Sequence, residues 1–166
     1  MVTRIPSATL VGVEARSVDV EVHVARGLPS MTIVGLPDAA VREARERVRA
    51  ALLSSGFDVP RARILVNLAP ADLRKEGPAL DLPIALALLA ADGRLPLESA
   101  GATLAVGELA LDGSLRSLRG AVAIGLLAVQ RRVDRILLPT ADAPAVHALD
   151  GPTVLPVASL ADAVAL

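Results

Sequence analysis

The sequence is nearly devoid of aromatic side chains: it has no tryptophan, no tyrosine and one phenylalanine, Phe57, in 166 residues. Proteins that stack nucleobases on a sheet surface or in a single-strand groove depend on aromatic rings. The composition therefore excludes an aromatic-sheet RNA binder and a stacking single-strand binder. Because 53% of the residues are hydrophobic, we expect one domain whose core consists of aliphatic side chains.

Cysteine is also missing, which excludes disulfides, thiol catalysis and cysteine-ligated metal. His23 and His147 are the only histidines, and their spacing is not that of a zinc site. Sixteen arginines and a single lysine, Lys75, leave a net charge of −1, so the chain as a whole is not a strongly basic nucleic-acid binder.

Long apolar runs and the common catalytic motifs are absent too. The longest stretches without a charged residue have 11 residues, fewer than the roughly 18–20 that span a bilayer, and no apolar signal core follows the N-terminus. We therefore expect a cytoplasmic protein without membrane contact. A Walker loop needs Gly-Lys-Ser/Thr, but the single lysine lies between Arg74 and Glu76. From the residues alone, we expect a non-catalytic domain without a metal or cofactor of its own.

Hydrophobic periodicity predicts strands that first pair as hairpins and then alternate with helices. The expected strands are 7–13, 18–24, 31–35, 61–68, 103–111, 114–118, 135–138 and 153–157. The expected helices are 37–56, 80–91, 120–132, 140–149 and 159–164. Between two of the strands, Asp112-Gly113 predicts a two-residue hairpin turn. This order predicts an α/β or α+β fold, with a mixed sheet and helices mainly on one face.

Two of the expected helices differ in their environment. The helix at 37–56 has one apolar side, and Glu43 and Arg47 are expected to form an i,i+4 pair on its solvent-exposed side. The helix at 80–91 is apolar nearly all round, so it is expected to be buried.

Two longer stretches are more specific: VNLAPADLRKEGPALDLPIA at 66–85 and VGELALDGSLRSLRGA at 106–121. Together with GLPD at 35–38 and REARERVRAA at 42–51, they resemble the N-terminal domain of the ComM/YifB family, the magnesium chelatase-like AAA+ ATPases of bacteria. The resemblance covers nearly the whole chain in order. It implies a Lon-protease-like fold of the ribosomal protein S-five domain-two-like superfamily, a single domain over 1–166, and an AAA+ module downstream.

The comparison with Lon-type proteases extends to single residues. In those proteases the nucleophilic serine follows an acidic-Gly-Pro motif, and here Glu76-Gly77-Pro78 is followed by Ala79. The position of the protease's lysine base falls at Val122. Neither side chain can do that chemistry, so the resemblance implies a degenerate Ser–Lys dyad and no enzymatic activity in this chain.

The resemblance implies a function within a larger machine. The resemblance to ComM implies that the full-length protein is a hexameric, ATP-driven motor that acts on DNA. Such a motor promotes branch migration during recombination in natural transformation. ATP and Mg²⁺ would belong to the downstream module, and this domain would serve self-association and DNA positioning. Two alternatives stay open: an active Lon-like protease, and a subunit-interaction domain of a magnesium chelatase-type complex.

One candidate DNA contact is a stripe of arginines along the helix at 37–56. Arg42, Arg45 and Arg49 follow an i, i+3, i+7 spacing and so share one side. Without stacking side chains, contact with DNA would run through its phosphates. Because Glu43 and Glu46 interleave with the arginines, a merely solvated face remains the alternative.

The second candidate is the pair Arg74 and Lys75, in the loop that leads to the next helix start, where anions are favoured. Glu76 and Asp81 lie in the same turn and oppose an anion. A loop shaped by its prolines and glycine, without a ligand, is therefore the alternative for this pair.

Overall fold

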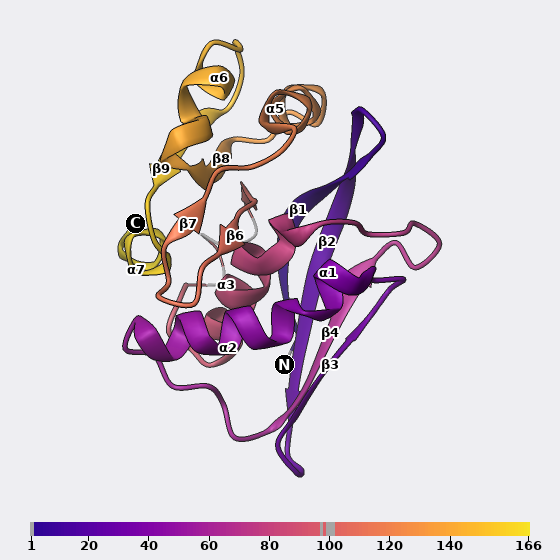
Figure 1. Ribbon diagram of the computed structural model, residues 1–166, viewed down its shortest axis with the longest axis vertical. Coiled ribbons are helices and arrows are strands. Elements are labelled where there is room, and N and C mark those ends of the chain that lie inside the picture. Colours follow the sequence, from indigo (N-terminus) through magenta and orange to yellow (C-terminus); the bar gives the residue numbers. More distant parts are fainter. Residues whose placement is uncertain (1, 97, 99–101) are drawn as a thin grey trace.

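The computed structural model describes residues 2–96, 98 and 102–166 (Figure 1). Its strands are β1 (Val2–Val11), β2 (Glu14–Ala25), β3 (Ser30–Val34), β4 (Arg63–Ala69), β5 (Thr103–Ala105), β6 (Glu108–Leu109), β7 (Leu115–Arg116), β8 (Arg135–Pro139) and β9 (Thr153–Val157). Its helices are α1 (Ala39–Arg42), α2 (Ala44–Ser54), α3 (Asp81–Ala91), α5 (Ala121–Gln130), α6 (Ala143–His147) and α7 (Leu160–Ala165), with 3-10 turns η1 (Pro78–Leu80) and η2 (Thr140–Asp142). The predicted α+β class is confirmed. In the described part of the chain, no helix is both long and apolar enough to cross a membrane.

The strands form three sheets. The largest has the order β1-β2-β4-β3, in which β3 runs parallel to β4 and the other pairs are antiparallel, as expected for a mixed sheet. A three-stranded parallel sheet, β5-β8-β9, and a two-stranded β6-β7 ribbon follow it. The period of two in β2 is confirmed, because Val18, Val20 and Val22 are buried while the residues between them are partly exposed.

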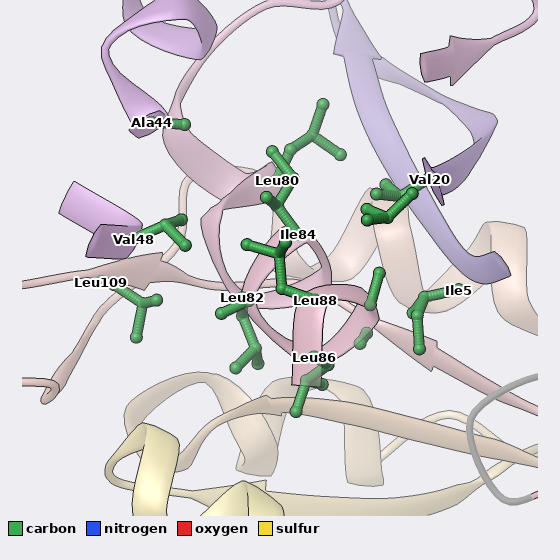
Figure 2. Close-up of a cluster of buried hydrophobic side chains, with 14 of the residues drawn as sticks. Ile5, Val20, Ala44, Val48, Leu80, Leu82, Ile84, Leu86, Leu88 and Leu109 are labelled. Atoms are coloured by element: carbon green, nitrogen blue, oxygen red, sulfur yellow. The ribbon is translucent and has the colours of Figure 1, made fainter. Parts of the chain in front are cut away.

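Helix α3 is the centre of the main core. Every residue from Leu82 to Ala90 is buried, which confirms the prediction from its all-round apolar sequence. Figure 2 shows Ile84 of α3 between Val20 of the sheet and Val48 of α2, with Ile5 of β1 close by. Aliphatic packing on both sides of one helix thus replaces the aromatic side chains that the sequence lacks.

The single helix expected at 37–56 is two helices, so that prediction was wrong in detail. The chain turns at Glu43, between α1 and α2. The break coincides with a hydrogen bond of 2.7 Å from the Arg47 guanidinium to the carbonyl of Ala40, a side-chain donor that competes for a helical acceptor. Val41 and Val48 nevertheless stay fully buried, as their spacing predicts.

The prediction of a single strand over 103–111 was also wrong. Its first part, β5, joins the parallel sheet, and its second part, β6, pairs with β7. The turn has three residues instead of two, because the amide of Ala110 donates to the carbonyl of Ser114 at 2.8 Å. Asp112 accepts from the amide of Ser114, and Gly113 adopts a φ of 89°, the left-handed conformation that such a loop needs.

The first strand connects the parts of the molecule through buried hydroxyl groups. Thr3 donates to a carbonyl of α3 at 2.8 Å, and Ser7 donates to a carbonyl of β5 at 2.7 Å. Thr9 donates to the carbonyl of Glu76 at 3.2 Å and accepts from its amide at 3.0 Å. Strand β1 therefore anchors the loop before α3 as well as the second sheet.

The helices α2 and α3 pack on one face of the four-stranded sheet, as expected, and α5 is the exception. Ala8 and Leu10, which alternate with the inward hydroxyl residues of β1, pack in a second cluster with Ile124 of α5. In Figure 1 the β1–β2 hairpin accordingly rises beside α5. A side chain at Gly120 would approach Leu10 to 2.5 Å, so the entry to α5 needs a residue without Cβ.

Candidate functional site

A cavity of about 470 Å³ opens between β1, the loop before α3 and the start of α5. Its wall includes Thr9, Ala79, Glu108, Ser117, Arg119 and Ile124. The position that matches the protease nucleophile therefore does lie at a cavity, where it presents a methyl group. Val122 is 48% exposed on α5 and is not among the described residues that line the cavity.

The hydroxyl groups of the cavity are engaged in holding the fold. Ser117 donates to Asp142 at 2.9 Å, and the other oxygen of that carboxylate accepts from the amide of Leu118 at 2.8 Å. Thr9 is paired with the backbone of Glu76. A nucleophilic hydroxyl needs an adjacent base, and the described lining residues include neither lysine nor histidine.

Lys75 is not a surface cation, so its prediction as a nucleic-acid contact was wrong. The residue has 0% exposure, and its ammonium donates to the carbonyl of Gly35 at 2.7 Å and to the carbonyl of Pro70. Its own amide donates to the carbonyl of Leu36, and its carbonyl accepts from the amide of Asp38. Burial lowers the pKa of Lys75, while nearby Asp72 opposes that shift. Lys75 therefore joins two loops. The sequence feature that could have indicated this special role is that Lys75 is the only lysine in a chain with sixteen arginines.

Arg74, the other residue of the predicted pair, is exposed and lies 3.8 Å from the carboxylate of Glu76. Such a surface pair contributes little to stability, but it places an acid beside the guanidinium. The two predicted residues thus lie in different environments: Lys75 is buried, and Arg74 is exposed with the charge of Glu76 close by.

The stripe Arg42, Arg45 and Arg49 is exposed along α1 and α2, despite the break between these helices. Arg42 donates to the carbonyl of Pro37 at 2.9 Å, and Arg45 donates to the carbonyl of Met31 in β3 at 3.4 Å. Within the described chain these three guanidinium groups form no ion pair. Their positive charge therefore remains available to an external anion.

Glu43, one of the acids interleaved with the stripe, turns away to Arg47. The distance between the two charged groups is 3.6 Å, so the predicted i,i+4 pair exists. Its predicted place on the solvent-exposed side was wrong, because the Arg47 side chain is only 17% exposed. The reason is a second carboxylate, Asp81 at the start of α3, which sequence spacing alone did not connect with Arg47.

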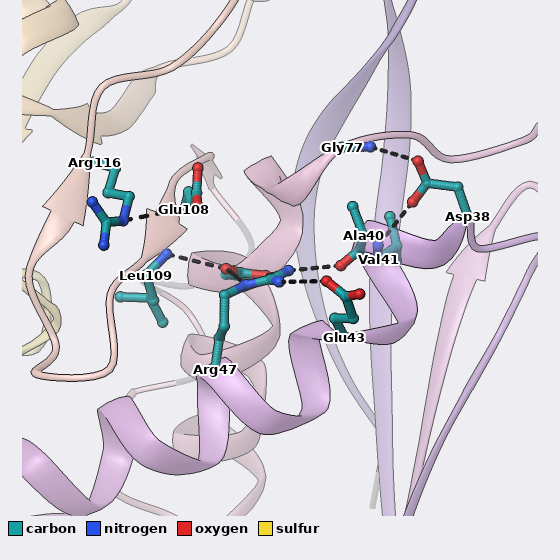
Figure 3. Close-up of polar contacts among 10 residues, drawn as sticks. Asp38, Ala40, Val41, Glu43, Arg47, Gly77, Glu108, Leu109 and Arg116 are labelled. Atoms are coloured by element: carbon teal, nitrogen blue, oxygen red, sulfur yellow. Dashed lines mark hydrogen bonds and ion pairs between the residues drawn. The ribbon is translucent and has the colours of Figure 1, made fainter.

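Arg47 and Asp81 form a two-pronged ion pair at the junction of α2 and α3. Figure 3 shows Arg47 with its other partners, Glu43 and Ala40. Nε lies 2.6 Å from one carboxylate oxygen and Nη2 lies 3.0 Å from the other. The amide of Leu109 in β6 also donates to Asp81, at 3.1 Å. Burial raises the pKa of Asp81 to about 6, against the opposing hydrogen bond from Arg47, and that bond in turn raises the pKa of Arg47.

Asp38 links the stripe to the cavity. It is the N-cap of α1, because its carboxylate accepts from the amide of Val41 at 2.8 Å. The other carboxylate oxygen accepts from the amide of Gly77 at 3.1 Å (Figure 3). The start of the arginine stripe and the loop at the cavity are therefore held by one side chain.

The elevated pKa of Asp81 predicts a pH dependence of stability. An unfolded Asp titrates near 3.9, so between about pH 4 and pH 6 the folded state holds a proton that the unfolded chain has lost. This contribution is fully present below about pH 4 and is lost as the pH rises through about 6. We expect the free energy of unfolding of the native chain, relative to Asp81→Asn, to fall over that window.

The same prediction is measurable residue by residue by NMR. The carboxyl carbon of Asp81 is expected to titrate near pH 6. Asp112 serves as an internal control, because hydrogen bonds from Ser114 lower its pKa. Titration of both carboxyl groups below pH 4 would contradict the dominance of burial at Asp81.

Lys75→Met is expected to destabilise the fold by about 2–5 kcal/mol, because it removes two charged hydrogen bonds, to the carbonyl groups of Gly35 and Pro70. The neighbouring Arg74→Gln is the matched control and is expected to change stability by less than about 0.5 kcal/mol, since Arg74 is exposed. Urea unfolding of the two variants measures both values. Equal stability of the two would show that the Lys75 contacts add nothing to the fold.

Comparison with known proteins identifies the family. The family model for subunit ChlI of Mg-chelatase matches residues 20–142. YifB of Escherichia coli K12 is 50% identical over 119 residues, which are 72% of this chain and 24% of YifB. Competence protein ComM of Haemophilus influenzae is 45% identical over 132 residues, 80% of this chain and 26% of ComM. Rv2897c of Mycobacterium tuberculosis H37Rv is 38% identical over 145 residues, 87% of this chain and 29% of the relative.

The chain thus spans about a quarter of the length of these relatives. The resemblance to ComM and YifB inferred from the motifs at 66–85 and 106–121 is confirmed, and both motifs lie within the matched residues. The chain belongs to the family of subunit ChlI of Mg-chelatase, as a domain homologous to part of YifB and ComM.

Proposed function

We propose that this chain is a non-catalytic accessory domain of a ComM-like AAA+ ATPase that acts on DNA in the cytoplasm. The similarity to a competence protein, ComM, over 80% of the chain supports a DNA-related role. The proposal extends this role to recombination and branch migration in natural transformation. In this proposal ATP and Mg²⁺ bind to another part of the full-length protein. This domain takes part in the self-association of the full-length protein into a hexameric ring, and it positions DNA.

The non-catalytic part of the proposal rests on the cavity at Ala79. Its hydroxyl groups are bonded to Asp142 and to the backbone of Glu76, and an alanine methyl stands at the nucleophile position. The cavity is present at the nucleophile position, but its described lining residues include no nucleophile–base pair. The subunit-interaction role of a magnesium chelatase-type complex remains the second candidate, because the family description names that complex.

The chain is expected to digest unfolded casein no faster than buffer does. Ala79→Ser combined with Val122→Lys is also expected to be inert, because position 122 is exposed on α5 and lies outside the described cavity wall. Release of casein peptides by the native chain, persisting through further purification, would favour the protease alternative. Saturable binding of a tetrapyrrole would instead favour the chelatase-type role.

The DNA-positioning part rests on a single observation: the stripe Arg42, Arg45 and Arg49 is exposed, and its guanidinium groups form no ion pair within the described chain. Guanidinium groups bind phosphate oxygens through paired hydrogen bonds. The fold keeps the stripe outward, because Asp38 caps its first turn and Arg47 is drawn into the core. One copy would bind DNA weakly, and several copies in a ring would raise the apparent affinity by multivalency.

Replacing the stripe by Arg42→Gln, Arg45→Gln and Arg49→Gln is expected to weaken DNA binding about equally for unrelated sequences. Each lost phosphate contact lowers the slope of log K against log salt by about 0.9 for duplex DNA, so the slope is expected to fall by up to roughly 2.7. Fluorescence anisotropy of two labelled duplexes over a salt series measures both effects.

The matched control removes three arginines that already have carboxylate partners: Arg4→Gln, Arg16→Gln and Arg116→Gln. It changes the net charge by the same amount, so it reports the effect of overall charge alone. If the stripe variant and the control bind DNA alike, the stripe is a solvated face and has no part in DNA contact.

A further inference from the structure

A second group of exposed arginines, which we call the basal arginines, consists of Arg26, Arg61 and Arg63. They lie where β2 ends and where β3 and β4 begin, at the lower end of the sheet in Figure 1. Within the described chain none of the three forms an ion pair. They share the property that singles out the stripe, but they come from a different part of the sequence.

Backbone contacts bring the basal arginines together. Ser30, the first residue of β3, is paired with Arg63, and its amide donates to the carbonyl of Ala62 at 3.2 Å. The aliphatic stem of Arg63 lies over the β2–β3 turn, because a Cβ at Gly27 would be 3.5 Å from Cβ of Arg63 and 3.8 Å from its Cδ. The turn after Arg26 and the segment from Arg61 to Arg63 are therefore in contact.

The basal arginines also adjoin the stripe through β3. Arg45 of the stripe donates to the carbonyl of Met31, the residue that follows Ser30. In the sheet order β1-β2-β4-β3, strand β3 is an edge. Arg63 alternates with buried Ile64, so it points to the face opposite the core, whereas Arg45 comes from α2 on the core side. Unpaired guanidinium groups thus flank the start of this edge strand on both faces.

The local charge differs sharply from the net charge of −1 for the whole chain. Asp58, an acid in the segment that leads to β4, is 3.7 Å from Arg94 and is thereby partly neutralised. Glu46, on α2 between two stripe arginines, is an exposed acid in this part of the surface. Several exposed arginines without an ion pair in the described chain therefore gather around the start of the edge strand.

We propose that the basal arginines form a phosphate-binding surface that continues the stripe around the start of β3 and takes the sugar-phosphate backbone of DNA. This inference rests on the proposed DNA-positioning function and extends it to a second set of residues. The five residues of β3 span about 16 Å at the usual rise per residue, a length over which a nucleic acid strand presents several phosphates. The surface has no stacking side chain, so it binds the backbone and reads no bases.

An acidic protein segment is the competing partner, and Leu28 distinguishes the two. This residue is 87% exposed in the turn that carries Arg26. A docked protein segment would bury such a side chain, whereas phosphate contacts leave it in water. We therefore expect Leu28→Ser to leave DNA affinity unchanged. A loss with Leu28→Ser as large as that with the arginine variants would overturn a phosphate-binding role.

The deciding experiment compares five forms of the chain. They are the native chain, the basal variant (Arg26→Gln, Arg61→Gln, Arg63→Gln), the same three positions changed to Lys, the stripe variant, and the paired-arginine control with Arg4, Arg16 and Arg116 replaced by Gln. Anisotropy with a labelled duplex and with one of its strands, over a salt series, gives affinity and salt slope. The basal variant is expected to lose about tenfold or more in affinity at low salt and up to roughly 2.7 in duplex slope beyond the control. Arg26→Lys, Arg61→Lys and Arg63→Lys together are expected to keep most of the slope, since the charges remain.

The outcomes separate the two proposals. If the stripe variant loses binding and the basal variant matches the control, the present inference is overturned and the proposed function stands. If both match the control, both fail. If the basal variant alone loses binding, the inference stands and the stripe is a solvated face. An unchanged thermal midpoint for the Lys variant verifies that its binding is that of a folded chain. Binding of polyglutamate as tightly as DNA would assign the surface to an acidic protein and overturn the inference.

Discussion

The buried ion pair between Arg47 and Asp81 is the contact on which the arrangement of the first half of the chain depends. It joins α2 to the start of α3. Asp81 also accepts a hydrogen bond from an amide of β6, and Arg47 donates to the carbonyl of Ala40 in α1. Removing one partner of such a pair typically costs about 3–5 kcal/mol, because the other charge stays buried. The pair also sets helix rotation: with Arg47 turned inward, the stripe of Arg42, Arg45 and Arg49 faces solvent.

Two further polar side chains connect these helices, through hydrogen bonds, with the loops at the cavity and at the edge of the sheet. Lys75 holds the loop at 35–38 against the loop at 70–75, and Asp38 connects α1 with Gly77 at the cavity wall. Hydrogen bonds consequently connect the cavity at Ala79 and the arginine-rich surface through these loops and helix starts. In the proposed function, this scaffold positions guanidinium groups for a phosphate backbone, while the cavity supplies no chemistry.

Local patterns predicted the elements whose environment is uniform. The period of two in β2 and the all-round apolar sequence of α3 each specify one kind of neighbour, and both predictions are confirmed. The break at Glu43 and the division of 103–111 between two sheets were not predicted. In both places a partner outside the regular local ladder intervenes: the Arg47 side chain takes the carbonyl of Ala40, and β8, far along the chain, pairs with β5.

By itself the sequence determined the family, the α+β class, the aliphatic core and the exclusion of aromatic and thiol chemistry, because composition and motif spacing suffice for these. Only the tertiary structure decided the environment of each charge. Lys75 and Arg74 are neighbours, yet one is buried among carbonyl groups and the other is exposed. Arg26 and Arg63 are 37 positions apart, yet the pairing of β2 with β4, in which Ala25 lies opposite Arg63, brings them to one end of the sheet. The exposure and the partners of a charged side chain depend on residues that are distant in sequence and that only folding brings near.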